Sequence, residues 1–311
     1  MELPGARPPT VALVASVAVS RFSRSLAPPE PPVRLPPART IFAPGRGELF
    51  LRDSGGDGPT VMLLHGWMAS ADINWFGAYD ALIEAGYRVL AIDHRGHGRG
   101  LRSIARFRLS DCADDAAAAL ELLGAVPATV VGYSMGGAIA QLVARDHAGV
   151  VSGLVLSGTA QDWQDPRERR FWRAMGALWL LLALAPRRVW RRALRQEGLG
   201  DTEAGSWLVS ELLRASASDL AEAGRELGRF DSRPWLDGLQ TRAAVVVTTK
   251  DRLVAPRKQR TLAAALGAQV FETPCDHLEV ISAKYNLALL KALDAVGAHE
   301  PATATAPSAA T

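Results

Sequence analysis

The chain has 311 residues, 48% of them hydrophobic, and its formal net charge at pH 7 is only +3. This length and apolar content predict a large buried core, in one large domain with an insertion or in two ordinary domains. The small net charge gives no support for a nucleic-acid partner. The two cysteines, Cys112 and Cys275, lie too far apart in sequence for a CxxC metal or redox motif.

The first forty residues show no pattern of a packed element. Residues 10–19 form an apolar run that is much shorter than the ~20 residues needed to cross a bilayer. One acid and one base precede the run instead of a positive cluster, so a secretory signal is disfavoured. Six prolines in 28–37 are typical of an extended arm. We therefore expect a poorly ordered arm over 1–40 and a cytoplasmic protein, with membrane association left open.

Beyond the arm, short apolar runs alternate with helical patterns. Continuous apolar runs indicate strands buried on both faces, and their alternation with helices predicts a mostly parallel sheet covered by helices on both sides, the α/β class. Strands are expected at 48–52, 61–64, 88–92, 129–131, 153–156, 243–249 and 268–271, and helices at 74–84, 110–124 and 137–144, the second capped by Ser110 or Asp111.

The sequence Gly132-Tyr133-Ser134-Met135-Gly136 joins one of these strands to a small-residue helix. A G-x-S-x-G motif in this context predicts a sharp strand-to-helix turn that holds a serine hydroxyl above the end of the sheet. Gly132 and Gly136 are expected to be structural, because a strained turn leaves little room for side chains beside the serine. Ser134 is therefore the candidate nucleophile.

A serine nucleophile needs a histidine base, and the histidine needs a carboxylate that fixes its tautomer. Asp251 follows the strand expected at 243–249, and His277 follows the last expected strand. Active groups in such sheets gather beyond the carboxyl ends of the strands. The order Ser134, Asp251, His277 is the order known for one scaffold.

On these residues the chain resembles the α/β-hydrolase family from about Phe42 to Val296. The resemblance also includes His65-Gly66-Trp67 and the run Asp93 to Gly98, each after a strand. It implies Ser134 as nucleophile, His277 as general base and then acid, Asp251 as the orienting carboxylate, and an oxyanion hole from the backbone N–H groups of Trp67 and Met135. Arg99 departs from the serine common in this loop, which should affect stability more than chemistry.

Other residues near these motifs have alternative interpretations. Asp276, Glu272 and Asp237 are fallback candidates for the triad acid, and Asp93 is interpreted as a turn residue. Three histidines could suggest a metal site, but each lies in a glycine-flanked turn where imidazoles commonly bond the backbone: His65, His94 and His97. Cys275 is interpreted as a packing residue. We expect no metal and no cofactor.

The strand pattern stops between 160 and 235, where helical sequence rich in tryptophan predicts a lid over the site. Nine arginines and one acid occur from Arg167 to Arg195, on both sides of the apolar stretch 174–185. Three interpretations remain open: a lid helix packed on the core with solvated arginines, a lid that contacts a lipid surface, and recognition of an anionic substrate.

The expected organisation is an arm over 1–40, a hydrolase core over 41–159 and 236–297, a lid over 160–235 and a disordered tail over 298–311. The expected function is hydrolysis of a carboxylic ester through an acyl-enzyme, with a small-molecule ester or lipid of apolar acyl character as substrate. C–C bond, thioester, lactone or perhydrolase chemistry on the same triad is the alternative, followed by a non-catalytic binding protein. Epoxide hydrolysis and dehalogenation are disfavoured, because relatives with those activities use aspartate in place of Ser134.

Overall fold

A mixed eight-stranded sheet forms the centre of the molecule, as a computed structural model shows. The structure describes residues 29–200, 202–279 and 282–299. The strand order is β1-β2-β4-β3-β5-β6-β7-β8; β1 and β2 pair antiparallel with their neighbours and the remaining strands are parallel. The predicted α/β class is confirmed.

The strands are β1 (Ala38–Ala43), β2 (Gly47–Asp53), β3 (Thr60–Leu64), β4 (Arg88–Ile92), β5 (Ala128–Tyr133), β6 (Val151–Ser157), β7 (Ala243–Thr248) and β8 (Gln269–Thr273). The helices are α2 (Ala71–Trp75), α3 (Tyr79–Glu84), α4 (Leu109–Leu122), α5 (Met135–Asp146), α6 (Pro166–Arg173), α7 (Met175–Leu184), α8 (Pro186–Gln196), α9 (Glu203–Leu212), α10 (Ala217–Leu227), α11 (Pro256–Ala265) and α12 (Ala283–Ala295), with 3₁₀ turns at Ala148–Val150 and Leu236–Gly238.

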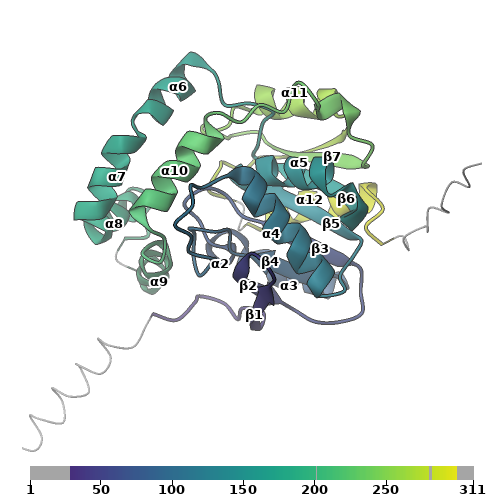
Figure 1. The fold of residues 1–311 in the computed structure, drawn as a ribbon, viewed down its shortest axis with the longest axis horizontal. Coiled ribbons are helices and arrows are strands. Elements are labelled where there is room, and N and C mark those ends of the chain that lie inside the picture. The colour runs from purple at the N-terminus through teal and green to yellow at the C-terminus, as the bar shows by residue number, and fades with distance from the viewer. Residues whose placement is uncertain (1–28, 201, 280–281, 300–311) are drawn as a thin grey trace, which may run out of the picture.

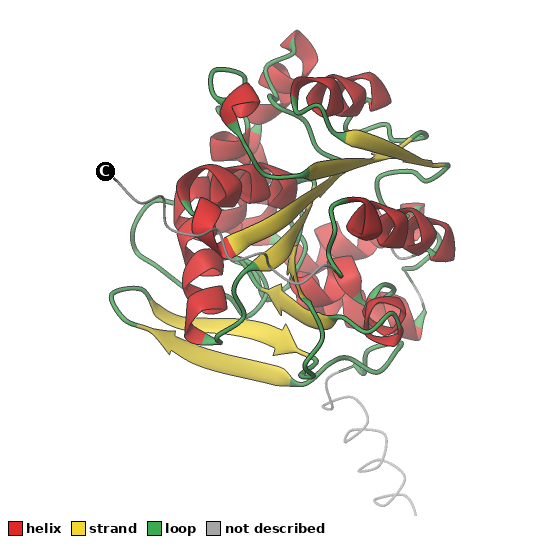
Figure 2. Cartoon of the chain, turned by 90° about the vertical axis from the view of Figure 1, so that its right-hand side faces the viewer, coloured by secondary structure: helices red, strands yellow, loops and turns green. Residues whose placement is uncertain are grey.

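Helices cover both faces of the twisted sheet (Figure 2). Along β3, Met62 and Leu64 face a core shared with α4, α5 and α11, whereas Val61 and Leu63 face a core shared with α2, α3 and α12. Successive side chains of a strand point to opposite faces, so a strand covered on both sides must be apolar at every position. This explains the continuous apolar runs in the sequence.

Both ends of the core differ from the expected boundaries. β1 begins at Ala38, and the Pro36 carbonyl accepts a hydrogen bond from Arg52, so the end of the expected arm belongs to the sheet edge. Ala298 is buried and His299 stacks on Tyr87, so the packed structure continues past residue 297. The remaining expectations for the arm and the tail fall on residues 1–28 and 300–311, outside the described residues.

Two helices also differ from the prediction. The helix expected at 74–84 is divided into α2 and α3, with Gly77 between them. Helix α4 begins at Leu109, so Ser110 and Asp111 lie in its first turn and neither caps it. Propensity and pattern identify a helix more reliably than its ends, because tertiary contacts decide where the last turn unwinds.

Between β6 and β7 the chain forms the five helices α6–α10, here called the lid, on one side of the core (Figure 1). Helix α10 lies against the loops that follow β3 and β4. A Cβ atom at Gly224 of α10 would lie 2.9 Å from the Trp67 ring, and one at Gly96 would lie 2.5 Å from Asp219. These glycines allow the lid to approach the core closely.

Arg99 joins the lid to the core through a buried ion pair. Its guanidinium donates two hydrogen bonds to Glu211 of α9, at 2.8 and 2.9 Å, and one to Asp72, at 3.2 Å. The side chains of Glu211 and Asp72 are only 2% and 1% exposed. The arginine that departs from the common serine of this loop therefore neutralises a buried lid carboxylate.

We predict that Arg99→Ala destabilises the protein by about 3 kcal/mol, because it leaves Glu211 buried without its bidentate partner. The free energy of unfolding in urea measures this change. Arg214→Ala is the control: Arg214 also contacts Glu211, but its side chain is 39% exposed, and the expected cost is below about 1 kcal/mol. Equal losses in the two variants would contradict the assignment.

Candidate functional site

Ser134 occupies the strained turn between β5 and α5. Its backbone has φ 54° and ψ −117°, a conformation that side-chain-bearing residues rarely adopt. A Cβ atom at Gly132 would lie 2.4 Å from the Gly136 carbonyl oxygen, and one at Gly136 would lie 2.1 Å from the Leu64 carbonyl oxygen. Any larger residue at either position would push α5 away from β3 and β5, so these two glycines allow the turn.

The side chains of Ser134, His277 and Asp251 form one hydrogen-bonded chain. His277 Nε2 lies 3.1 Å from Ser134 Oγ, and His277 Nδ1 lies 2.7 Å from Asp251 Oδ2. All three residues are less than a tenth exposed. Each follows the carboxyl end of a parallel strand, β5, β7 or β8, so the sheet brings together residues that are far apart in the sequence.

Asp251 is held by four further hydrogen bonds. Its Oδ1 accepts from the amides of Leu253 and Val254, at 2.9 and 2.8 Å, and its Oδ2 accepts from Thr248 Oγ1 and, at 3.3 Å, from Gln259 Nε2. Burial alone would raise the pKa of Asp251, but the hydrogen bond and charge of His277 and the Val254 amide outweigh burial, and the net pKa is lowered. The Asp251 carboxylate is therefore ionised at neutral pH. It accepts a hydrogen bond from the Nδ1–H of His277.

None of the other candidate acids is hydrogen-bonded to the His277 ring. Glu272 pairs with Arg260, and Asp237 is exposed in the 3₁₀ turn before β7. Asp276 accepts from the His277 backbone amide and pairs with Arg252. Asp93 accepts from the amides of Ala71 and Arg99, as a buried turn residue does; burial and the nearby Asp72 raise its pKa to about 6.

Cys275 is buried, and its Sγ contacts Thr273 and Ser282 rather than Ser134 or His277. This matches its interpretation as a packing residue.

The first turn of α5 and the loop after β3 meet beside Ser134. Met135 is the first residue of α5, where an N–H has no acceptor within the helix and the helix dipole is positive. The loop after β3 also reaches this point, because a Cβ atom at Gly66 would lie 3.3 Å from Ser134 Cβ. The amide of Trp67 follows directly. The amides of Met135 and Trp67 are therefore the candidate donors to a negatively charged oxygen.

Three buried histidines lie beneath this loop. The His65 Nδ1–H donates to the Gly66 carbonyl and its Nε2 accepts from the His94 amide, which ties the loop after β3 to the loop after β4. The ring centroids of His65 and His94 are 4.2 Å apart, and those of His65 and His97 are 5.5 Å apart. In the part of the chain that the structure describes, no group of three His, Cys, Asp or Glu residues has the arrangement of a metal site.

Two further residues, Gln259 and Tyr133, support the site and were not predicted from the sequence. Gln259 is fully buried, donates to Asp251 and to the Val254 carbonyl, and accepts from the Thr248 amide. Tyr133 donates its hydroxyl hydrogen to the His277 carbonyl. Gln259 directly follows the cation pair Arg257-Lys258 in a helix of polar sequence, and nothing in this pattern indicates that its side chain turns inward.

An aromatic cluster covers Trp67 in the loop after β3. The rings of Phe171 and Trp172 meet the Trp67 ring edge to face, with centroids 5.9 and 5.4 Å away. Trp67 Nε1–H also donates to the Leu220 carbonyl of α10. The inner surface of the lid near Ser134 is therefore apolar and aromatic.

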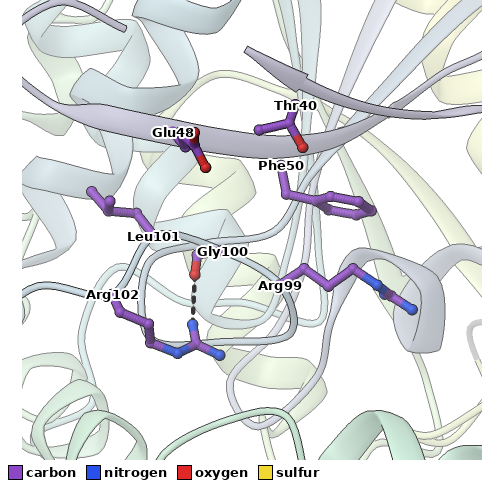
Figure 3. Close-up of a pocket in the computed structure, with 7 residues that line it drawn as sticks. All are labelled: Thr40, Glu48, Phe50, Arg99, Gly100, Leu101 and Arg102. Carbon is purple, nitrogen blue, oxygen red and sulfur yellow. Dashed lines mark hydrogen bonds between the residues drawn. The ribbon is translucent and has the colours of Figure 1, made fainter. Parts of the chain in front are cut away.

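A separate pocket of about 320 Å³ lies between strands β1 and β2 and the loop after β4 (Figure 3). Its lining residues are Thr40, Glu48, Phe50, Arg99, Gly100, Leu101 and Arg102. Both arginines are already engaged, Arg99 with Glu211 and Arg102 with backbone carbonyls. The lining includes no member of the Ser134 site, so this pocket has no part in its chemistry.

A family profile described as the alpha/beta hydrolase fold matches residues 59–283, well over half of the chain. The chain belongs to the alpha/beta hydrolase family. The matched range includes Ser134, Asp251 and His277 in the order characteristic of that fold. The protein is accordingly an enzyme of the hydrolase type.

Curated relatives of this hydrolase match it over part of their length. A non-heme haloperoxidase of Rhodococcus erythropolis is 41% identical over 112 residues, 36% of this chain and 40% of the relative. A bifunctional esterase/perhydrolase of Acinetobacter calcoaceticus is 39% identical over 111 residues, 35% of this chain and 40% of the relative. The hydrolase thus matches well under half the length of these relatives.

The similarity of the fold extends further. The enol-lactonase of Burkholderia xenovorans superposes with a TM-score of 0.71 at 21% identity, over 82% of this hydrolase and all of the lactonase. At this identity the likeness shows the fold alone. No helix among the described ranges is both long enough and apolar enough to cross a bilayer.

We predict that the buried histidines make this hydrolase sensitive to acid. Burial, and for His94 the neighbouring His97, lowers the pKa of His94 to about 3 and that of His97 to about 4. An unfolded histidine titrates near 6.5, so the unfolded chain binds more protons below that pH and stability falls from about pH 6.5 towards about pH 3. At pH 5 each of these two histidines is expected to lower the free energy of unfolding by about 2 kcal/mol. Asp93, whose raised pKa acts in the opposite direction between about pH 3.8 and 6, offsets part of the loss.

Urea unfolding of the wild type and of His94→Asn at pH 7 and pH 5 measures this effect. The variant should lose less stability than the wild type between the two pH values. Equal losses of stability in the wild type and in His94→Asn would show that His94 is not buried in its neutral form.

Proposed function

We propose that this hydrolase cleaves carboxylic esters with an apolar acyl group through an acyl-enzyme formed on Ser134. The observation that carries the proposal is the continuous chain from Ser134 Oγ through the His277 ring to Asp251, with contacts of 3.1 and 2.7 Å. A serine hydroxyl is a poor nucleophile at neutral pH, and a histidine held in this way supplies the base that it lacks.

In the acylation step, Ser134 Oγ attacks the ester carbonyl carbon while its proton passes to His277 Nε2. Asp251 fixes the tautomer with the proton on Nδ1, so Nε2 is free to accept, and its charge stabilises the imidazolium that forms. When the tetrahedral intermediate collapses, the imidazolium gives its proton to the leaving alkoxide. The alcohol departs and the acyl group remains on Ser134.

The tetrahedral intermediate places a negative charge on the former carbonyl oxygen. The amides of Met135 and Trp67 are the proposed donors to this oxygen, because both come from loops that meet beside Ser134. Fixed donors of this kind require no reorganisation during the reaction, and removal of one typically costs 10²- to 10³-fold in kcat. In this mechanism the lid shields the region from bulk water, which strengthens the interaction.

Water completes the cycle in the deacylation step. His277 Nε2 takes a proton from a water molecule as its oxygen attacks the acyl carbon, and then returns that proton to Ser134 Oγ. The products are the carboxylic acid and the free enzyme, so no cofactor or metal is needed for the balance of atoms.

The lid supports the choice of an apolar acyl group. The rings of Trp67, Phe171 and Trp172 lie together at the oxyanion loop, and the Met175 sulfur would lie 2.5 Å from a Cβ atom at Gly224 on the same side of α10. Such a surface favours alkyl chains over charged groups. The substrate class proposed is therefore a small-molecule ester or a lipid ester.

Perhydrolysis is the second candidate. One relative is named a bifunctional esterase/perhydrolase, another a non-heme haloperoxidase and a third a non-heme chloroperoxidase. In this reaction hydrogen peroxide replaces water in the second step and the product is a peracid. Both candidates share the acyl-enzyme and differ only in the molecule that attacks it.

We predict that a fluorophosphonate probe labels the wild type and that Ser134→Ala is not labelled. With p-nitrophenyl esters from acetate to decanoate, kcat/KM should rise with acyl length up to the capacity of the lid, and Ser134→Ala should lose at least about 10³-fold. Well-folded wild type that neither reacts with the probe nor turns over any ester would contradict the proposal.

Matched acid variants test the orienting carboxylate. Asp251→Asn should lower kcat about 10³- to 10⁴-fold, because His277 loses the correct tautomer. Glu272→Gln, whose carboxylate pairs with Arg260 instead, should retain activity. The reverse result would assign the acid to Glu272.

A further inference from the structure

Helix α7 exposes apolar side chains where a water-facing helix carries polar ones. A narrow stripe of Met175, Leu178 and Leu182, at the spacing i, i+3, i+7, packs inward against the other lid helices. The rest of the helix faces outward, and no charged residue occurs between Ala174 and Ala185. The large exposed members, with Phe171 at the end of α6, form an apolar patch: Phe171, Trp179, Leu180, Leu181 and Leu184, which are 46–76% exposed.

The next helix presents a face of arginines. Arg187, Arg188, Arg191 and Arg192, at the spacing i, i+1, i+4, i+5, share one exposed side of α8, while Trp190 is buried on the other. None of these four guanidiniums pairs with a carboxylate of any residue that the structure describes. Their charge is therefore not neutralised within the described part of the molecule.

The apolar patch and the arginine face meet in one open groove. The groove, of about 570 Å³, is lined by Leu184, Ala185 and Pro186 at the α7–α8 turn and by Arg187, Arg188 and Arg191. Both helices lie at the outer edge of the lid, away from the sheet (Figure 1). A solvent-facing surface is thus apolar on one helix and cationic on the next, and no other described part of the chain covers it.

We propose that this surface docks the hydrolase on an anionic lipid bilayer. The apolar patch enters the region between headgroups and acyl chains, and the arginine face pairs with lipid phosphates, with a headgroup in the groove at the α7–α8 turn. Helix α7 has ten residues, about 15 Å of helix, so it lies in the interface and does not cross the membrane. Arginine stems cover apolar surface while their charged ends remain in the headgroup layer.

The charge pattern favours a lipid surface over a second copy of this chain. A copy would bring an identical arginine face against this one, and four unpaired guanidiniums on each side would repel. An anionic bilayer supplies phosphates at any lateral position and accepts a convex apolar helix without a matching groove. Phe171 belongs to the patch and also touches Trp67, so lipid esters would enter beside Ser134; this last step rests on the proposed function, whereas docking does not.

Flotation of the full chain with phosphatidylcholine vesicles, with and without phosphatidylglycerol, tests the docking in the absence of an ester substrate. The wild type should bind the anionic vesicles and be released at high salt. Arg187→Glu with Arg191→Glu should weaken binding on the order of 25-fold or more, because each arginine near an anionic surface contributes about fivefold. Leu180→Ser with Leu184→Ser should weaken it about tenfold or more.

Matched variants elsewhere on the surface are the controls. Arg106→Glu with Arg108→Glu makes the same change of charge in the exposed loop before α4, and Leu287→Ser removes a leucine that is 64% exposed on α12. Both should bind vesicles nearly as the wild type does, and all variants should keep the wild-type melting temperature. The proposal is overturned if the wild type does not bind anionic vesicles, if the lid variants bind as tightly as the controls, or if the patch mediates self-association without vesicle binding. Each result is independent of whether the enzyme hydrolyses esters.

Discussion

The left-handed backbone of Ser134 is the constraint on which the rest of the molecule depends. A φ of 54° at a residue with a side chain costs free energy, and the surrounding packing must supply it. The Ser134 amide donates to the Ser157 carbonyl, and Thr159 Oγ1 donates to the Ser134 carbonyl, so β6 holds the turn from one side. From the other side, α5 fits against the end of β3 only because Gly136 has no side chain. The sheet thus fixes the hydroxyl at a point that loops from β3, β7 and β8 can all reach.

The lid combines tight internal anchoring with an outer surface that no other described segment covers. Arg99 binds Glu211 at one end of the lid, and Lys258 of α11 binds Glu168 of α6 at the other, at 2.9 Å. Between these anchors, α10 packs on Trp67 and α7 packs on α10, so the inner faces form an aromatic cover over the site. The outer face of α7 is apolar to the same degree. A helix that is apolar on all sides needs an apolar environment on its outer face as well. The position of α7 beside the arginine face fits the proposed anionic lipid bilayer.

Much of the fold and the positions of the site residues could be predicted because their signals are local. Continuous apolar runs indicate the buried strands, and the order of Ser134, Asp251 and His277 at strand ends indicates the candidate site. The errors and omissions came from tertiary contacts. Nothing in the local sequence separates α2 from α3 except Gly77, or shows that the Gln259 side chain turns inward to Asp251. The partner of Arg99 is 112 residues away on α9, and only the folded chain reveals that this departure from the common serine serves to hold the lid.

The most direct test of the account is whether an acyl group is carried on the Ser134 side chain during turnover. Intact-mass spectrometry of enzyme quenched in acid during hydrolysis of p-nitrophenyl butyrate, followed by peptide mapping, measures this intermediate. The variant His277→Ala, which cannot activate the deacylating water efficiently, provides a second sample in which a slowly formed acyl-enzyme should persist. We predict a mass increase of one butyryl group, located on the peptide that contains Ser134 and absent from Ser134→Ala. A butyryl group on Cys275, or turnover with no covalent adduct in either sample, would contradict the central claim.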